Sequence, residues 1–409
     1  MKPRTDVKLG QLALAATCGF WFGTLALGPS LAAARDTDVH TFPITVVDNR
    51  IFVDVKLDGT GPYKFILDSG GGRGAVLDAA LFTRLGVVST AESQERGAGE
   101  STQRALHGTL KALAVDDFRI PNLSVIGLDL APLAGVIGFP QLDGVLGDDL
   151  FRRYVVYVDY QRNELQIESP RHFRIPRGGL VVPIRLYQNF IPVATGSVDG
   201  IPGSIAIDLG DRSALTLFGP FWRAHRIDEV DGPAYDAMTG YGIGGPINAK
   251  LTRVRELKFG QISVANPVTR LSLQQRGAFA DSKIAGSVGG AILSRFEVIF
   301  DYPHGRIILI PRPDAPEQAT DRSGAWFAVD ASGIYVYAVA PGTPAAEAGL
   351  RVRDRVVEIN GVASGAFDVF ELRGLASDLR TDELALLVER SGSRLGKTLR
   401  LRDLIPGAR

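Results

Sequence analysis

The chain is poor in residues that supply redox or metal chemistry. Its 409 residues include one cysteine, Cys18, and five histidines, which are scattered without the spacing of metal ligands (His40, His107, His172, His225 and His304). Because Cys18 falls in an N-terminal segment that we expect to be removed, the mature chain has neither a disulfide nor a thiol nucleophile. We therefore expect no metal and no other cofactor.

The chain also lacks an excess of charge of either sign. Forty-five Lys and Arg residues balance 45 Asp and Glu residues, and this balance gives no electrostatic footprint for a nucleic-acid partner. Glycine, in contrast, is abundant at 47 residues. Together with many short apolar runs, this composition favours a mainly β protein of two or three domains.

The first 34 residues have the pattern of an export signal. Three basic residues near the start are followed by residues 9–34, which carry no charge and end in Ala32-Ala33-Ala34. Cleavage there predicts an exported protein, periplasmic or secreted in a bacterium. If it stays uncut, the same run is long enough to anchor the chain in the inner membrane with the rest outside the cytoplasm. We expect no other membrane contact.

A long internal repeat dominates the remainder. Residues 42–77 align without a gap on residues 182–217, so that Asp68 falls on Asp208 and Gly70 falls on Gly210. A second block repeats at an offset of 142 and places Gly147 on Gly289. Repeats of this kind indicate two structurally similar halves.

Both repeats place their acid in the same local setting. Phe65-Ile66-Leu67 and Ile205-Ala206-Ile207 are apolar runs typical of buried strands, and each is followed directly by Asp. The glycine two residues later lets the backbone turn tightly. A single motif of this kind is usually an ordinary turn, but its duplication favours a site that shares two carboxylates.

These motifs together resemble the lobes of pepsin/retropepsin-like aspartic proteases. The family pattern is apolar-apolar-Asp-Thr/Ser-Gly, followed well downstream by apolar-apolar-Gly. The first half matches it at residues 66–70 and 145–147, and the second half at residues 206–210 and 287–289. The resemblance implies a mainly β fold with two pseudo-symmetric lobes and a cleft between them.

The resemblance further implies an aspartic endopeptidase that acts on peptides or proteins. Its catalytic residues would be Asp68 and Asp208, supported by the loop residues Ser69, Gly70, Leu209, Gly210, Gly147 and Gly289. Two carboxylates about 3 Å apart cannot both ionise, so they share one proton. One then activates a water as general base while the other polarises the scissile carbonyl.

Two residues of the second half depart from the family pattern. Leu209 stands where a Thr or Ser would hydrogen-bond across to the other loop, as Ser69 can. Asp211 adds a third carboxylate, which would disfavour ionisation of the pair unless it points to solvent. Two alternatives therefore stay open: an inactive peptide-binding protein on the same scaffold, or a homodimer that uses Asp68 of two chains.

The family also folds a glycine-rich hairpin, or flap, over its cleft. The candidates here are Gly97 and Gly99 in the first half, and Tyr241 and Gly242 in the second. Ordinary surface hairpins are the competing interpretation of both segments.

The end of the chain has a different pattern. An alternating strand from Gly333, a short Ala-rich helix and a strand ending in Asn360-Gly361 closely resemble the PDZ domains of bacterial proteases. Such domains bind an extended peptide, commonly a C-terminus, along a sheet edge. The resemblance places the groove near Trp326, Phe327, Ile334 and Val336, where it would recruit or regulate substrate. A domain that only packs on the lobes is the alternative.

The expected domain limits follow from these motifs. They are a signal or anchor over residues 1–34, lobe one over 40–173, lobe two over 178–312, a linker over 313–322 and the PDZ-like domain over 323–405.

Overall fold

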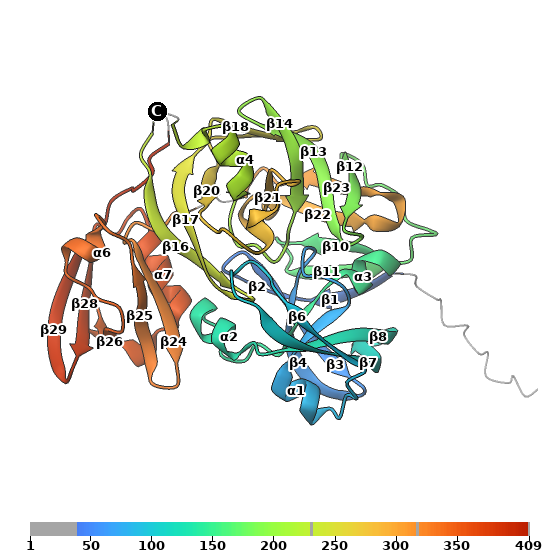
Figure 1. The fold of residues 1–409 in the computed structure, drawn as a ribbon, viewed down its shortest axis with the longest axis horizontal. Coiled ribbons are helices and arrows are strands. Elements are labelled where there is room, and N and C mark those ends of the chain that lie inside the picture. Colours follow the sequence, from blue (N-terminus) through green and yellow to red (C-terminus); the bar gives the residue numbers. More distant parts are fainter. Residues whose placement is uncertain (1–38, 230–231, 316–318, 408–409) are drawn as a thin grey trace, which may run out of the picture. The chain divides into compact units, whose positions relative to one another are not determined.

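The computed structural model describes residues 39–229, 232–315 and 319–407. Its strands form three sheets with short helices at their ends, so the predicted mainly β fold is confirmed (Figure 1). The export signal predicted for residues 1–34 lies outside the described residues.

Lobe one is built on an eight-stranded sheet. Its order is β2-β3-β4-β9-β5-β8-β7-β6. The strands are β2 (Thr45–Val47), β3 (Arg50–Leu57), β4 (Thr60–Leu67), β5 (Ala75–Asp78), β6 (Ala91–Glu95), β7 (Gln103–Val115), β8 (Phe118–Leu128) and β9 (Gly144–Leu146). Helices α1 (Ala79–Arg84) and α2 (Ala131–Ile137) belong to the same lobe.

Lobe two contributes twelve strands to a fifteen-stranded sheet. They are β12 (Leu180–Tyr187), β13 (Ile191–Val198), β14 (Ile201–Ile207), β15 (Leu215–Leu217), β16 (Tyr235–Gly242), β17 (Gly245–Arg253), β18 (Glu256–Phe259), β19 (Ile262–Ala265), β20 (Val268–Ser272), β21 (Gly286–Val288), β22 (Phe296–Asp301) and β23 (Arg306–Pro311). Helices α4 (Gly219–Ala224) and α5 (Gly290–Leu293) complete it.

The two lobes share part of this sheet. Strands β1 (Val39–Pro43), β10 (Val155–Asp159) and β11 (Glu164–Glu168) come from lobe one, yet they extend the sheet of lobe two. The junction is an antiparallel pairing of β10 with β22, with α3 (Asp148–Arg153) just before β10. The lobes are therefore joined by backbone hydrogen bonds as well as by side-chain packing.

The repeated motifs form repeated strand pairings. Strand β4 runs parallel to β9, with Leu67 opposite Leu146, and β14 runs parallel to β21, with Ile207 opposite Val288. Each strand that precedes an acid is thus held by the strand that ends in the second glycine motif. This pairing explains why the two motifs recur together although about 75 residues separate them in each half.

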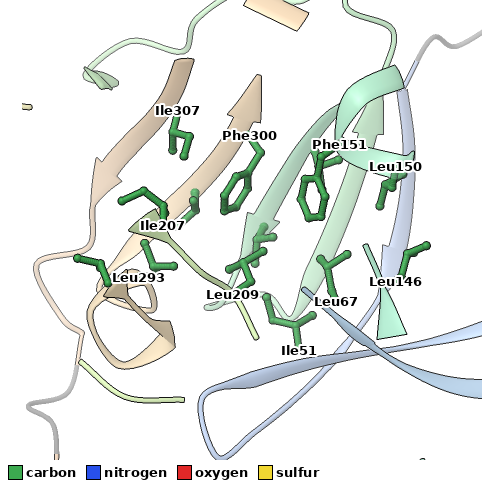
Figure 2. Close-up of a cluster of buried hydrophobic side chains, with 14 of the residues drawn as sticks. Ile51, Leu67, Leu146, Leu150, Phe151, Ile207, Leu209, Leu293, Phe300 and Ile307 are labelled. Atoms are coloured by element: carbon green, nitrogen blue, oxygen red, sulfur yellow. The ribbon is translucent and has the colours of Figure 1, made fainter. Parts of the chain in front are cut away.

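An apolar core lies beneath both acidic loops. Figure 2 shows Leu67 and Leu209 pointing into one cluster with Phe151 and Phe300. Leu209 is fully buried there, and burial of a leucine side chain contributes about 1.5–3 kcal/mol to stability. Leu209, which stands where the family has a Thr or Ser, therefore packs in the apolar core.

The C-terminal domain has its own sheet and its own core. The sheet order is β24-β25-β26-β28-β29, with β27 paired to β26. The strands are β24 (Ala325–Asp330), β25 (Gly333–Val339), β26 (Arg355–Ile359), β27 (Val362–Ala363), β28 (Glu383–Arg390) and β29 (Ser393–Arg400), and the helices are α6 (Pro344–Glu347) and α7 (Val369–Ser377). The elements expected at residues 333–361 are all present.

Candidate active site

The structure brings the two predicted acids together. Asp68 follows β4, Asp208 follows β14, and their carboxyl groups hydrogen-bond to one another. Each carboxylate also accepts the N–H two residues later, from Gly70 at 2.8 Å and from Gly210 at 2.9 Å. Both acids are half-buried, as expected for side chains that turns lift out of the core.

The two loop glycines make this approach possible. A β-carbon on Gly70 would lie 3.0 Å from the carboxyl carbon of Asp208, and one on Gly210 would lie 2.3 Å from that of Asp68. Both distances are too short for a carbon–carbon contact. Any side chain at these positions would push the acids apart.

The electrostatics of the pair favour one shared proton. Burial raises the pKa of Asp208 well above its usual range, and the neighbouring charge of Asp68 raises it further. Burial also raises the pKa of Asp68, but the Gly70 N–H and the hydrogen bond with Asp208 oppose that shift. The pair titrates as a unit that shares one proton.

Ser69 joins the two loops. Its buried hydroxyl donates to the Ile207 carbonyl at 2.9 Å and accepts the Leu209 N–H at 3.0 Å. The Tyr302 hydroxyl of lobe two donates to the Ser69 carbonyl at 3.2 Å. Leu209 returns no side-chain hydrogen bond, so the side-chain hydrogen bond from lobe two to the loop of Asp68 comes from Tyr302 instead.

The third acid, Asp211, does not point to solvent. Its side chain is 6% exposed and forms an ion pair with Arg270, which is equally buried. It also accepts hydrogen bonds from the Ser213 N–H and the Thr216 hydroxyl, each at 3.0 Å. Burial raises its pKa, but Arg270 and these donors outweigh that effect and hold the pKa below its usual range. Asp211 is thus an ionised and compensated neighbour of the pair.

The second glycine of each lobe permits a close backbone approach. A β-carbon on Gly147 would lie 2.6 Å from the Gly74 carbonyl oxygen, and one on Gly289 would lie 2.3 Å from the Asp211 carbonyl oxygen. Both glycines therefore let the returning strand pass directly against an acidic loop.

The flap candidates of the two lobes meet each other. The Gly99 N–H donates to the Ile243 carbonyl at 2.9 Å, and the Ser101 N–H donates to the Gly244 carbonyl at 2.9 Å. A β-carbon on Gly242 would lie 2.8 Å from the β-carbon of Ala98, so the two candidate segments approach each other too closely for a side chain at Gly242. Gly97 accepts a further bond from the Ala278 N–H at 2.9 Å.

The predicted groove residues of the C-terminal domain lie in two different environments. Phe327, Ile334 and Val336 are buried in the core of that domain. Trp326 instead faces lobe one, where its indole N–H donates to the Val136 carbonyl at 2.9 Å. The Trp326 ring also lies 4.6 Å from the Arg373 guanidinium.

Four charged residues near the site were not predicted from the sequence: Arg270, Asp48, Arg50 and Arg212. Arg270 is the charged residue of a strand that is otherwise uncharged, Val268–Ser272, and a buried charge of this kind requires a partner. Asp48 is buried and pairs with Arg50 at 2.8 Å and with Arg212 through its Nε at 2.7 Å. The internal repeat does distinguish Asp48. The aligned residue of the second half is the neutral Gln188, so the charge at this position is particular to the first half.

A cavity of about 150 Å³ adjoins this cluster. It lies between lobe two and the C-terminal domain, and its lining includes Arg212, Tyr235, Arg270, Asp321, Trp326 and Arg373. In the described ranges no group of three or more His, Cys, Asp or Glu side chains is arranged to hold a metal ion. None of the helices described is long and apolar enough to cross a membrane.

Two protein-family models match the chain. An aspartyl protease model matches residues 53–150, and a PDZ domain model matches residues 335–390. The chain carries an aspartyl protease domain and a C-terminal PDZ domain. The architecture suggested by the sequence motifs is thereby confirmed.

The aspartyl protease match includes Asp68 and Gly147, whereas Asp208 lies beyond it in the second repeat. Among solved structures, the crystal structure of basic 7S globulin from soybean aligns with 69% of this chain and 99% of its own, at 10% identity and a TM-score of 0.41. A search of curated proteins finds no match.

Proposed function

We propose that the protein is an exported aspartic endopeptidase that uses Asp68 and Asp208. The observation that carries this proposal is the hydrogen-bonded pair of half-buried carboxyls, one from each repeat, with raised pKa values. Groups with strongly shifted pKa values that face one another are typical of acid–base catalysis. The uncharged run before Arg35 supports export.

The mechanism follows from the one proton that the pair shares. The ionised carboxylate of the pair accepts a proton from a water molecule that attacks the scissile carbonyl of a bound peptide. The protonated carboxyl of the pair donates its proton toward the carbonyl oxygen as negative charge develops there. Collapse of the tetrahedral intermediate returns a proton to the leaving amine, and the pair is restored with one shared proton.

Two features weigh against the alternatives that the sequence left open. Asp68 already bonds to Asp208 within one chain, so a second chain is not needed to complete the pair. Arg270 compensates the charge of Asp211, which removes the main electrostatic objection to an active pair. The remaining alternative, a peptide-binding protein without activity, is decided by experiment.

The test is hydrolysis of a mixed peptide library between pH 3 and 8 by the wild type, Asp68→Asn and Asp208→Asn. Each variant should lose roughly 10²–10⁴-fold in kcat/KM while it stays folded. Asp117→Asn is the control, because that side chain is 81% exposed. An inactive wild type would favour the binding protein, and an active Asp208→Asn variant would favour the homodimer.

A further inference from the structure

One edge of the PDZ sheet is covered by lobe one. Strand β24 is the outer strand of that sheet, with β25 as its partner, and α7 lies beside it. An exposed strand edge next to a helix is where an extended peptide can add to a sheet. Here α2 of lobe one contacts β24 instead.

The contact is made by the C-terminal end of α2. Arg373 of α7 donates to the Val136 and Ile137 carbonyls, each at 2.9 Å, and Trp326 donates to Val136 as well. The last carbonyls of a helix lack partners within the helix and carry partial negative charge. The guanidinium of Arg373 thus binds a pair of oxygens, as it would bind the carboxylate at the end of a peptide.

Two glycines fit α2 to this surface. A β-carbon on Gly135 would lie 2.7 Å from the Val329 carbonyl oxygen, and one on Gly138 would lie 2.5 Å from Cγ1 of Val369. Beyond them, the rings of Phe139 and Phe370 lie 4.7 Å apart. The segment therefore contacts both the strand and the helix that border the edge.

The same segment contacts the flap of lobe two. Ala134, Ile137 and Phe139 share an apolar cluster with Tyr241 and Ile243 at the tip of the β16–β17 hairpin. The Tyr241 ring also packs edge-on against the ring of Tyr337 of β25, with ring centroids 6.1 Å apart. The hairpin tip is consequently held by α2 and by the PDZ domain together.

We propose that residues 130–139 are an intramolecular ligand of the PDZ domain, and that this docking holds the two flaps closed against each other. The external partner that fits the edge is a peptide with a free C-terminal carboxylate, which competes with the α2 carbonyls for Arg373. Its binding releases α2 and the hairpin tip. The effect on catalysis rests on the proposed function, whereas the docking itself does not.

A matched pair of glycine substitutions tests the docking. Gly135→Ala adds a methyl group against the Val329 carbonyl, whereas Gly374→Ala adds one on α7 where nothing lies within 4 Å. Alanine is the better helix former at both positions, so helix propensity is matched. In full-length protein, Gly135→Ala should speed amide hydrogen exchange of residues 131–139 and 241–245 by about tenfold or more, and Gly374→Ala should not.

Faster exchange in residues 131–139 alone would overturn the link to the flap, and no change in either segment would overturn the docking. Arg373→Ala repeats the test from the PDZ side. Its control is Arg380→Ala, because the Arg380 side chain is 90% exposed and pairs with Asp378.

A peptide measures the competition directly. A labelled peptide with the sequence of residues 130–137 and a free carboxylate should bind Gly135→Ala about tenfold more tightly than the wild type, because the wild-type edge is already occupied. The amidated peptide should bind Gly135→Ala more weakly than the peptide with the free carboxylate does. Equal affinity of the free acid for both proteins would overturn the proposal.

Activity provides a separate readout. If the endopeptidase function holds, Gly135→Ala should raise kcat/KM for a protein substrate several-fold over Gly374→Ala, because an open flap admits bulky chains. If the enzyme is active and the two variants have equal kcat/KM, the proposal that docking holds the flaps closed is overturned. An inactive wild type with the expected exchange result would instead show that the proposed function fails while the docking stands.

Discussion

The Leu209 N–H donates to the Ser69 hydroxyl at 3.0 Å, across the boundary between the two repeats. The same hydroxyl donates to Ile207 at 2.9 Å, so one buried side chain fixes the backbone on both sides of Asp208. The separation of the two acids therefore depends on Ser69.

Replacing Ser69 with alanine should weaken both the fold and the site. The variant leaves the Ile207 carbonyl and the Leu209 N–H buried without partners, at a cost of roughly 1–3 kcal/mol for each group. Urea unfolding should show this loss, and kcat should fall. Ser69→Thr keeps the hydroxyl and should recover most of the stability, so an equally destabilised threonine variant would contradict this role.

Asp208→Asn should be more stable than the wild type at pH 7. The pKa of Asp208 is raised in the folded state, so its ionisation as the pH rises destabilises the fold, and asparagine cannot ionise. The advantage should shrink as the pH falls toward and below the ordinary aspartate value of 3.8, because Asp208 then becomes protonated in the unfolded wild type as it already is in the folded one. Unfolding free energies measured at pH 7 and pH 4 check the sign, and a variant less stable at pH 7 would refute it.

Arg270→Gln should destabilise the protein by roughly 3–5 kcal/mol, because it leaves the buried Asp211 charge without its partner. Adding Asp211→Asn should recover a large part of this loss, since the double variant buries no unpaired charge. Thermal unfolding of the two single variants and the double variant gives the coupling energy. Additive effects would mean that the ion pair does not compensate Asp211.

Asp48→Ala should lower the free energy of unfolding by about 3–5 kcal/mol, because Asp48 is buried and pairs with Arg50 and Arg212. Arg373 of the PDZ domain also lies 3.8 Å from it, so the change should loosen the docked PDZ domain. Asp54→Ala is the control, since its pair with Lys64 is exposed and worth about 0–1 kcal/mol. Similar losses of unfolding free energy from both variants would show that the buried ion pairs of Asp48 stabilise the fold no more than the exposed pair of Asp54 does.

The repeated pattern was enough to predict the pair of acids, the strands before them and the glycines that support them. These features depend on short segments: an apolar strand, an acid and a glycine define the turn locally, and duplication implies that the turns are related. The elements of the PDZ domain were predictable for the same reason. A hairpin turn such as Asn360-Gly361 requires a backbone conformation that few residues adopt.

The compensation of Asp211 and the docking of the PDZ domain were decided only by tertiary structure. Arg270 lies 59 positions from Asp211, and Arg373 lies 237 positions from Val136, so no sequence periodicity relates these partners. The sequence left two orientations open for Asp211, and only the packing around it shows that it is buried and paired. Whether a buried charge stabilises or disrupts a fold depends on the distance and geometry of its partner, and those exist only once the chain has folded.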